Sequence, residues 1–313
     1  MSDYRHRLPQ LGDSFFLTDG GIETTLIFHQ GLDLPLFASY VLLEDEAGRE
    51  ALKSYYRDYL RIAEEHGVAF ILESPTWRCS RDWGAQLGHD ANRIEAINRD
   101  AIKLMEELRR EALTGAPIVI SGNIGPRGDG YAPERQLSAD EAEEYHGHQI
   151  RTFADTAADM VAAVTMTHTG EAIGVVRAAR SAGMPVAIAF TTETDGRLPS
   201  GEALGEAVEK VDDATGAAPV YYMINCAHPD HFSDALGEGA WRSRIRGIRA
   251  NASRKSHAEL DNSDVLDAGD PVALARDYMR LRRRLPHLSV FGGCCGTDHR
   301  HIEQICISCL EAA

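Results

Sequence analysis

The 313-residue sequence predicts a (β/α)8 barrel, an α/β fold that we expect to form a single domain over residues 1–313. Short apolar runs of β-forming residues recur along the chain, and helix-like segments lie between them. Eight such units fit the chain length, because about 250 residues is typical of this barrel. An open doubly wound sheet is the alternative. It is less favoured, since the chain carries neither a P-loop nor a glycine-rich dinucleotide motif after its first apolar run.

The expected strands share a short apolar composition and are bounded by glycine, proline or polar residues. In chain order they are residues 15–19, 68–74, 117–122, 160–166, 185–190, 220–225, 245–250 and 288–293. The first ends in Asp19-Gly20-Gly21 and the last leads into Gly292-Gly293-Cys294-Cys295. In a barrel, residues that follow the strands lie together at the catalytic end.

Helical spacing of apolar residues predicts the intervening helices. Tyr55, Tyr59 and Ile62 follow this spacing ahead of Gly67, which can end a helix. The other expected helical segments are residues 91–111, 139–158, 171–182, 201–215 and 271–285. Between them we expect residues 125–141 to form a loop over the barrel mouth. Residues 252–271 carry Asp261, Asp264, Asp267 and Asp270, and we expect a solvated surface loop in preference to a cation site.

Composition limits the classes of partner. The chain has 32 Lys and Arg against 48 Asp and Glu, a formal net charge of −16, which repels nucleic acid and anionic membrane surfaces. The N-terminal residues lack the apolar core of a signal peptide, and no stretch has the roughly 18 apolar residues of a membrane span. We therefore expect a cytoplasmic protein with small-molecule partners, and a homo-oligomer remains open. In that reducing compartment the six cysteines are expected as thiols or metal ligands.

Three cysteines are predicted at one rim of the barrel. Cys226 follows the sixth expected strand, and Cys294 and Cys295 follow the eighth. Glycines beside the Cys-Cys pair permit the sharp turn that would aim both thiols at one point. Three thiolates suit a tetrahedral Zn²⁺ with one position left for substrate, although buried apolar cysteines or a redox pair would give the same spacing. Cys306 and Cys309 are expected to pack in the last helix, and Cys79 receives no role.

The chain resembles the homocysteine S-methyltransferase family. The resemblance rests on Asp19-Gly20-Gly21, on Ile224-Asn225-Cys226 and above all on the block from Gly292 to Thr297, and it runs from the first strand to the end of the chain. It implies a barrel that holds Zn²⁺ through Cys226, Cys294 and Cys295. It also implies that a homocysteine thiol bound there attacks an electrophilic methyl group and becomes methionine. The metal-bound substrate thiolate would carry this chemistry, with no separate catalytic side chain.

The same resemblance assigns substrate contacts. Asp19, Gly20 and Gly21 would hold the amino-acid end of the substrate, although the glycines alone fit a tight turn. Asn251 would lie near the metal, where its oxygen can fill the fourth position, and a turn-capping asparagine is the alternative. Trp77 would line the pocket or pack in the core.

One position departs from the family. Relatives usually carry a glutamate for the substrate ammonium at the end of the fourth strand, where this chain has Val164. Either another carboxylate, such as Glu73 or Glu23, replaces it, or the acceptor is a different thiol. His168 is a candidate partner for a substrate carboxylate.

The methyl donor is inferred by elimination. A barrel fills a chain of this length, which argues against cobalamin- or folate-dependent transfer and against the extension of betaine-dependent relatives. A sulfonium compound, S-methylmethionine or S-adenosylmethionine, is therefore expected. Two other classes stay open: a zinc enzyme that hydrolyses or rearranges a small sulfur compound with Glu73 as base, and a non-catalytic zinc-binding barrel.

Overall fold

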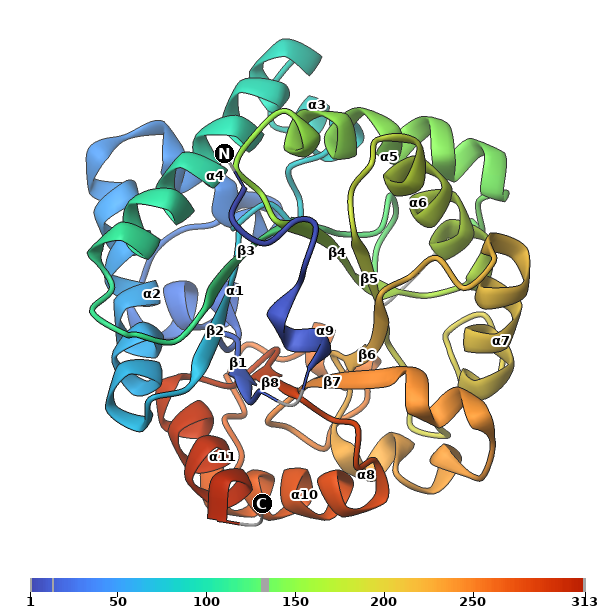
Figure 1. Ribbon diagram of the computed structural model, residues 1–313. Coiled ribbons are helices and arrows are strands. Elements are labelled where there is room, and N and C mark those ends of the chain that lie inside the picture. The colour runs from blue at the N-terminus through green and yellow to red at the C-terminus, as the bar shows by residue number, and fades with distance from the viewer. Residues whose placement is uncertain (1, 13, 131–134, 312–313) are drawn as a thin grey trace.

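Eight parallel strands close into a barrel in the computed structural model, which describes residues 2–12, 14–130 and 135–311 (Figure 1). Each strand pairs with its neighbour in chain order, and the eighth pairs with the first. The predicted closed barrel is confirmed and the open sheet is excluded. The strands are β1 Phe16–Leu17, β2 Ala69–Glu73, β3 Ile118–Ile124, β4 Met160–Met166, β5 Val186–Phe190, β6 Tyr221–Asn225, β7 Ile245–Ala250 and β8 Val290–Gly293.

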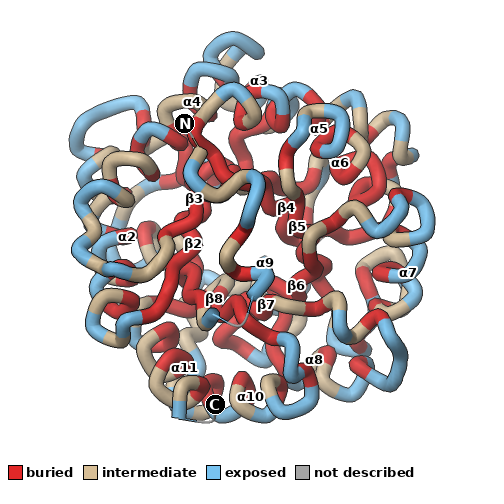
Figure 2. Tube along the Cα trace, viewed as in Figure 1, coloured by how far each residue is buried: buried red, intermediate tan, exposed pale blue. Residues whose placement is uncertain are grey.

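The strands are buried on both faces, as parallel strands covered by helices must be. In β2, Ile71 belongs to the cluster that fills the barrel, whereas Phe70 and Leu72 pack in the cluster between barrel and helices. The strands are accordingly buried, whereas exposure is concentrated on the surrounding helices and loops (Figure 2). Because side chains alternate, a polar residue on the inner face of a strand near its end points into the barrel mouth.

Helices surround the barrel, and most begin and end at the residues that local chemistry favours. α2 ends before Gly67, whose left-handed φ of 63° terminates it as predicted. α5 ends at Ala154, earlier than the predicted residue 158. The helices are α1 Ile22–Thr24, α2 Glu46–His66, α3 Arg81–Gln86, α4 Ala91–Glu111, α5 Ala139–Ala154, α6 Thr169–Ser181, α7 Leu204–Thr215, α8 Pro229–Phe232, α9 His257–Asp261, α10 Pro271–Arg284 and α11 His299–Glu311.

The N-terminal segment covers the amino end of the barrel, where it crosses the centre of the view in Figure 1. Leu8 is buried in the cluster inside the barrel, and the carboxylate of Asp159, just before β4, accepts the backbone N–H groups of Asp3 and Tyr4. Arg5 donates to the carbonyls of Ala154, Thr156 and Ala158. This end is therefore closed, and an accessible site belongs at the opposite end.

Two long loops lie at that opposite end. The predicted loop 125–141 ends earlier than expected, because Ser138 and Glu141 form a capping box that starts α5 at Ala139. Its Asp129 and Gly130 line the central cavity, whereas residues 131–134 fall outside the described residues. The loop 252–271 is not simply a solvated excursion. It contains the short helix α9, and its Leu260, Val265 and Asp267 line the same cavity.

Within the described ranges, none of the helices has the length and apolar character needed to cross a membrane.

Candidate metal and substrate site

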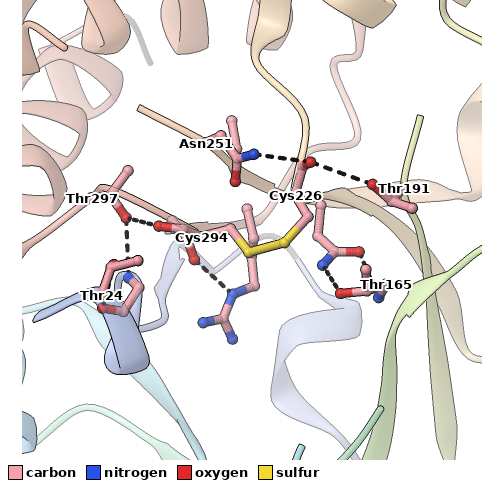
Figure 3. The surroundings of a disulfide bond; sticks show 12 residues. Thr24, Thr165, Thr191, Cys226, Asn251, Cys294 and Thr297 are labelled. Atoms are coloured by element: carbon pink, nitrogen blue, oxygen red, sulfur yellow. Dashed lines mark hydrogen bonds between the residues drawn. A yellow bond between two sulfur atoms is a disulfide. The ribbon is translucent and has the colours of Figure 1, made fainter. Parts of the chain in front are cut away.

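The three predicted cysteine ligands meet at the carboxyl ends of β6 and β8. One sulfur atom from each of Cys226, Cys294 and Cys295 lies within 4.8 Å of the others. The structure joins Cys226 and Cys294 in a disulfide (Figure 3). The six cysteines were expected as thiols or metal ligands and not as disulfides; the absence of a disulfide is wrong for this pair, since the fold brings the two sulfurs within bonding reach. The other three cysteines, Cys79, Cys306 and Cys309, are buried, and the last two pack in α11 as predicted.

Backbone contacts fix the turn that carries Cys294 and Cys295. Gly296 has a left-handed φ of 80°, which only glycine adopts without strain, and its N–H donates to Thr24 Oγ1 over 3.1 Å. Thr297 Oγ1 donates to the Cys294 carbonyl over 2.7 Å. A methyl group on Gly293 would collide with Thr297 Oγ1, so this glycine is required by close approach. The glycines therefore permit the turn that the sequence predicts.

Cys226 adopts a left-handed conformation with φ of 53°, which is uncommon for a residue with a side chain. Its carbonyl accepts hydrogen bonds from Thr191 Oγ1 at 3.3 Å, His257 Nε2 at 2.6 Å and Asn251 Nδ2 at 3.0 Å. These donors come from three segments of the chain. Together they hold the sulfur of Cys226 toward the other two cysteines.

Asn251 lies beside the cysteines, where the resemblance places it. Its Nδ2 donates a hydrogen bond to the Cys226 carbonyl, and its buried Oδ1 has no hydrogen-bond partner among the described residues. Figure 3 shows this oxygen on the side of the sulfur atoms. A buried carbonyl oxygen without a partner is costly, so the position suits an atom that accepts its lone pair.

A cavity of about 650 Å³ opens beside the cysteines, within the size range of small-molecule sites. It brings together the predicted site residues other than Asn251 and the candidate His168. The lining includes Asp19, Gly20, Gly21, Trp77, Val164, Cys226, Cys294 and Cys295. His168 is not among the lining residues; it is buried and caps α6 by accepting the Glu171 N–H. His168 therefore has a structural role as the cap of α6.

The Asp-Gly-Gly turn is tightly packed. A methyl group on Gly20 would come within 2.7 Å of Tyr59 Oη, and one on Gly21 within 2.6 Å of the Cys294 carbonyl oxygen. Gly20 is thus required by the close approach of α2, and Gly21 by the close approach of the turn after β8. The Asp19 carboxylate is 2% exposed and accepts from Tyr55 Oη at 2.9 Å and from Arg249 Nη2 at 2.7 Å.

Two arginines that the sequence argument missed line the cavity. Arg249 extends from β7, and Arg78 lies over the rings of Trp77 and Trp83, 4.3 and 3.5 Å from their centroids. The sequence does contain a feature that points to Arg249. It is a charged residue within an expected buried strand, and such a residue needs a partner or a function. Burial lowers the pKa of Arg249, but the carboxylates of Asp19 and Glu73 outweigh this effect and keep the guanidinium charged.

The two candidate substitutes for the missing glutamate both line the cavity. Burial raises the pKa of Glu73 to about 7, although Arg249 opposes the shift. Burial also raises the pKa of Glu23 to about 7, while its Oε1 accepts from Ser39 Oγ over 2.8 Å. Val164, at the position of the missing glutamate, is 7% exposed on the inner face of β4.

Comparison with known proteins agrees with this architecture. A family model described as homocysteine S-methyltransferase matches residues 16–309. Two crystal structures of the homocysteine methyltransferase MmuM from Escherichia coli are similar to the chain, each over 97% of this chain and 99% of that one. The metallated form has a TM-score of 0.74 at 18% identity, and the oxidised form 0.75 at 19%. The structural likeness shows the shared fold, and the family match spans every strand of the barrel. The chain is therefore a methyltransferase that belongs to the homocysteine S-methyltransferase family.

Proposed function

We propose that this chain is a zinc-dependent enzyme that transfers a methyl group from a sulfonium donor to homocysteine and forms methionine. The observation that carries the proposal is the group of three cysteine sulfurs at the wall of a cavity large enough for small substrates. Family membership supports the reaction class.

The residues present fit a zinc ion. Zn–S bonds of about 2.3 Å in a tetrahedron put the sulfurs about 3.8 Å apart, and the three sulfurs lie within 4.8 Å of one another. Cys226, Cys294 and Cys295 would hold the ion once the Cys226–Cys294 pair is reduced, and Asn251 Oδ1 is the nearby uncommitted oxygen. Bound zinc would lower the pKa of a substrate thiol and so supply the nucleophile at neutral pH.

The chain's own residues position the substrates. The closed amino end of the barrel leaves the acceptor one approach, from the mouth, and the loops at the mouth limit water there. In the reaction, the acceptor sulfur forms a bond to the methyl carbon as the bond from that carbon to the sulfonium sulfur breaks. The donor leaves as a neutral thioether, and the thiol proton goes to solvent. No side chain must exchange a proton with the methyl group.

Charge at the cavity supports a cationic donor. Six carboxylates line it against two guanidinium groups, which favours a positively charged ligand over an anionic one. The carboxylates are those of Asp19, Glu23, Glu73, Asp129, Asp261 and Asp267.

The test is methionine formation by the reduced, zinc-loaded chain. Isotope-labelled homocysteine is supplied with S-methylmethionine or with S-adenosylmethionine, since the label separates new methionine from the methionine that S-methylmethionine releases. Labelled methionine with either donor, together with about one zinc per chain, is the expected result. A zinc-loaded chain that forms none with either donor contradicts the proposal.

A different acceptor thiol is the second candidate, and Val164 is the observation that favours it, because valine cannot pair with an ammonium group. Methylation of another thiol in an acceptor panel, with homocysteine unused, would select it.

A further inference from the structure

We infer that Arg249 and Glu73 form the acceptor's binding site for an α-amino acid, with Arg249 holding the carboxylate and Glu73 the ammonium. This inference rests on the proposed function, because it names how the acceptor is recognised at the same cavity. It moves amino-acid recognition from the fourth strand to β2 and β7.

Both side chains point into the barrel near the cysteines. Glu73 continues the inner series of Ala69 and Ile71 on β2, and Arg249 lies between Ile248 and Ala250, which pack on the outer side of β7. Both line the cavity, at 2% and 7% exposure. They therefore offer opposite charges to a ligand at the depth of the cysteines.

Each of the two groups keeps an unused polar atom. Arg249 Nη1 and Glu73 Oε2 are buried and have no hydrogen-bond partner among the described residues. The nearest approach between the two side chains is 4.0 Å, from Nη1 to Glu73 Oε1, which is too long for a hydrogen bond. Buried charged groups without hydrogen-bond partners are unfavourable, so a ligand that supplies one acceptor and one donor is favoured here.

Arg249 is held in a fixed orientation. Its Nε donates to the Gly293 carbonyl over 3.1 Å and its Nη2 to Asp19 over 2.7 Å, which leaves Nη1 facing the cavity. The backbone carbonyl of Arg249 accepts the Cys226 N–H at 3.1 Å. The arginine is thus connected to both strands that carry the cysteines, and a carboxylate on it would have a defined place relative to the sulfurs.

The remaining carboxylates are less suited to the ammonium. Both oxygens of Asp19 already accept, one from Arg249 and one from Tyr55, and the arginine cancels its charge. Glu23 is more exposed than Glu73 and already accepts from Ser39 Oγ. Glu73 is the most buried acid with an uncommitted oxygen. An α-amino acid matches the pair in charge, because its carboxylate faces the arginine and its ammonium faces the glutamate. Its two charged groups are bonded to one carbon atom, so both can reach side chains that lie as close together as Arg249 and Glu73.

The inference defines the substrate class as a thiol that carries both amino-acid groups. A site that pairs with a polar group rejects an analogue lacking it, because its own buried charge is then left unpaired. We expect each missing group to weaken binding by about 10- to 100-fold.

Calorimetric titration of the reduced, zinc-loaded chain tests this without relying on turnover. The three ligands are homocysteine, mercaptobutyrate, which lacks the ammonium, and aminopropanethiol, which lacks the carboxylate. Homocysteine should bind tightest by the factor above. Equal affinity for all three thiols would overturn the inference, even if methionine is formed.

Variants assign the two roles. In Glu73→Gln the preference for homocysteine over mercaptobutyrate should largely disappear, while the preference over aminopropanethiol stays. In Arg249→Met the preference for homocysteine over aminopropanethiol should largely disappear, while the preference over mercaptobutyrate stays. Arg249→Lys should restore part of the preference for a ligand with a carboxylate. Arg244→Met, in which the arginine lost pairs with Asp212 and does not line the cavity, is the matched control. If both variants weaken all three ligands equally, the residues have only a structural role.

The two proposals fail separately. Selective homocysteine binding without methyl transfer supports this inference and contradicts the proposed reaction. Methyl transfer to homocysteine with no selectivity among the thiols supports the proposed reaction and contradicts this inference. The ligand comparison uses the unaltered chain, so the test holds even if Arg249→Met, which leaves Asp19 unpaired, fails to fold.

Discussion

Single residues define the metal hypothesis, because the backbone of the proposed ligands is held by contacts that do not involve their sulfur atoms. Cys226 has its carbonyl held by three donors, and the Cys295 carbonyl accepts the Ala252 N–H at 3.0 Å. The sulfurs are therefore directed by the backbone, and removing one leaves the turn in place. Loss of metal should be separable from loss of fold.

Cys226→Ser, Cys294→Ser and Cys295→Ser should each remove most of the zinc and most of the methyl transfer, because a serine hydroxyl is a far weaker zinc ligand than a thiolate. Zinc content of the reduced proteins, by elemental analysis, is the measurement. Cys306→Ala is the control, since Cys306 is buried in α11 and should leave zinc content unchanged. One zinc per chain retained in any serine variant would show that its cysteine is not a ligand.

Glu73 predicts a pH dependence at the amino-acid site. Burial raises its pKa to about 7, so the carboxylate that would bind an ammonium is lost as the pH falls through neutrality. The groups that face or influence it are Asp19, Arg249, Tyr56 and Tyr221. Burial raises the pKa of both tyrosines above the usual value, and Arg249 stays charged. Burial also raises the pKa of Asp19, while Glu73, with a pKa of about 7, is the group expected to titrate near neutrality.

Affinity for methionine, whose thioether does not titrate, should therefore rise by about tenfold between about pH 6 and pH 8. Calorimetry at several pH values measures it, and Glu73→Gln should give a flat profile. The same rise in Glu73→Gln would assign the titration to another group.

At the level of elements, the ends of β4 and β6 hold each other in strained conformations. Thr165 and Cys226 both have left-handed backbones, with φ of 62° and 53°. Between them, Asn225 accepts the Thr165 N–H and donates to Thr165 Oγ1, each over 2.9 Å. The side chain of Asn225 therefore stabilises the turn that presents the first cysteine.

Asn225→Ala should lower the free energy of unfolding by about 2 kcal/mol, because the Thr165 N–H is left buried and unpaired. It should also weaken zinc binding by about tenfold, since the Cys226 turn is released. Denaturant unfolding and competition with a zinc chelator measure the two effects. Asn98→Ala removes a similarly buried amide, which bonds to the carbonyls of Cys79 and Ile94, and should cost stability without changing zinc affinity. Equal zinc affinity in both variants would contradict the positioning role.

At the level of the whole molecule, periodicity and strand ends predicted the barrel and the rim that carries the cysteines. Local patterns sufficed there, because each βα unit buries its own apolar residues in the same way. The sequence could not show that Arg249 would pair with Asp19. The two residues are 230 positions apart and meet only because β7 and β1 both lie beside β8. Nor did the acidic composition of residues 252–271 reveal that Leu260 and Val265 would turn toward the cavity.

The two ends of the barrel should also separate stability from function, as is general for this fold. Asp159 ties the amino end together: its carboxylate accepts from the backbone of Asp3, Tyr4 and Ile120 and pairs with Arg109 at 3.1 Å. Asp159→Ala leaves those donors without their acceptor and should lower the free energy of unfolding by about 3 kcal/mol. Zinc content and homocysteine affinity of the folded protein should stay unchanged, because no lining residue of the cavity is altered. Glu73→Gln is the opposite case and should change homocysteine affinity without a comparable loss of stability. Denaturant unfolding, zinc analysis and calorimetry on both variants give the comparison, and a folded Asp159→Ala protein that has lost zinc would show that the two ends are coupled.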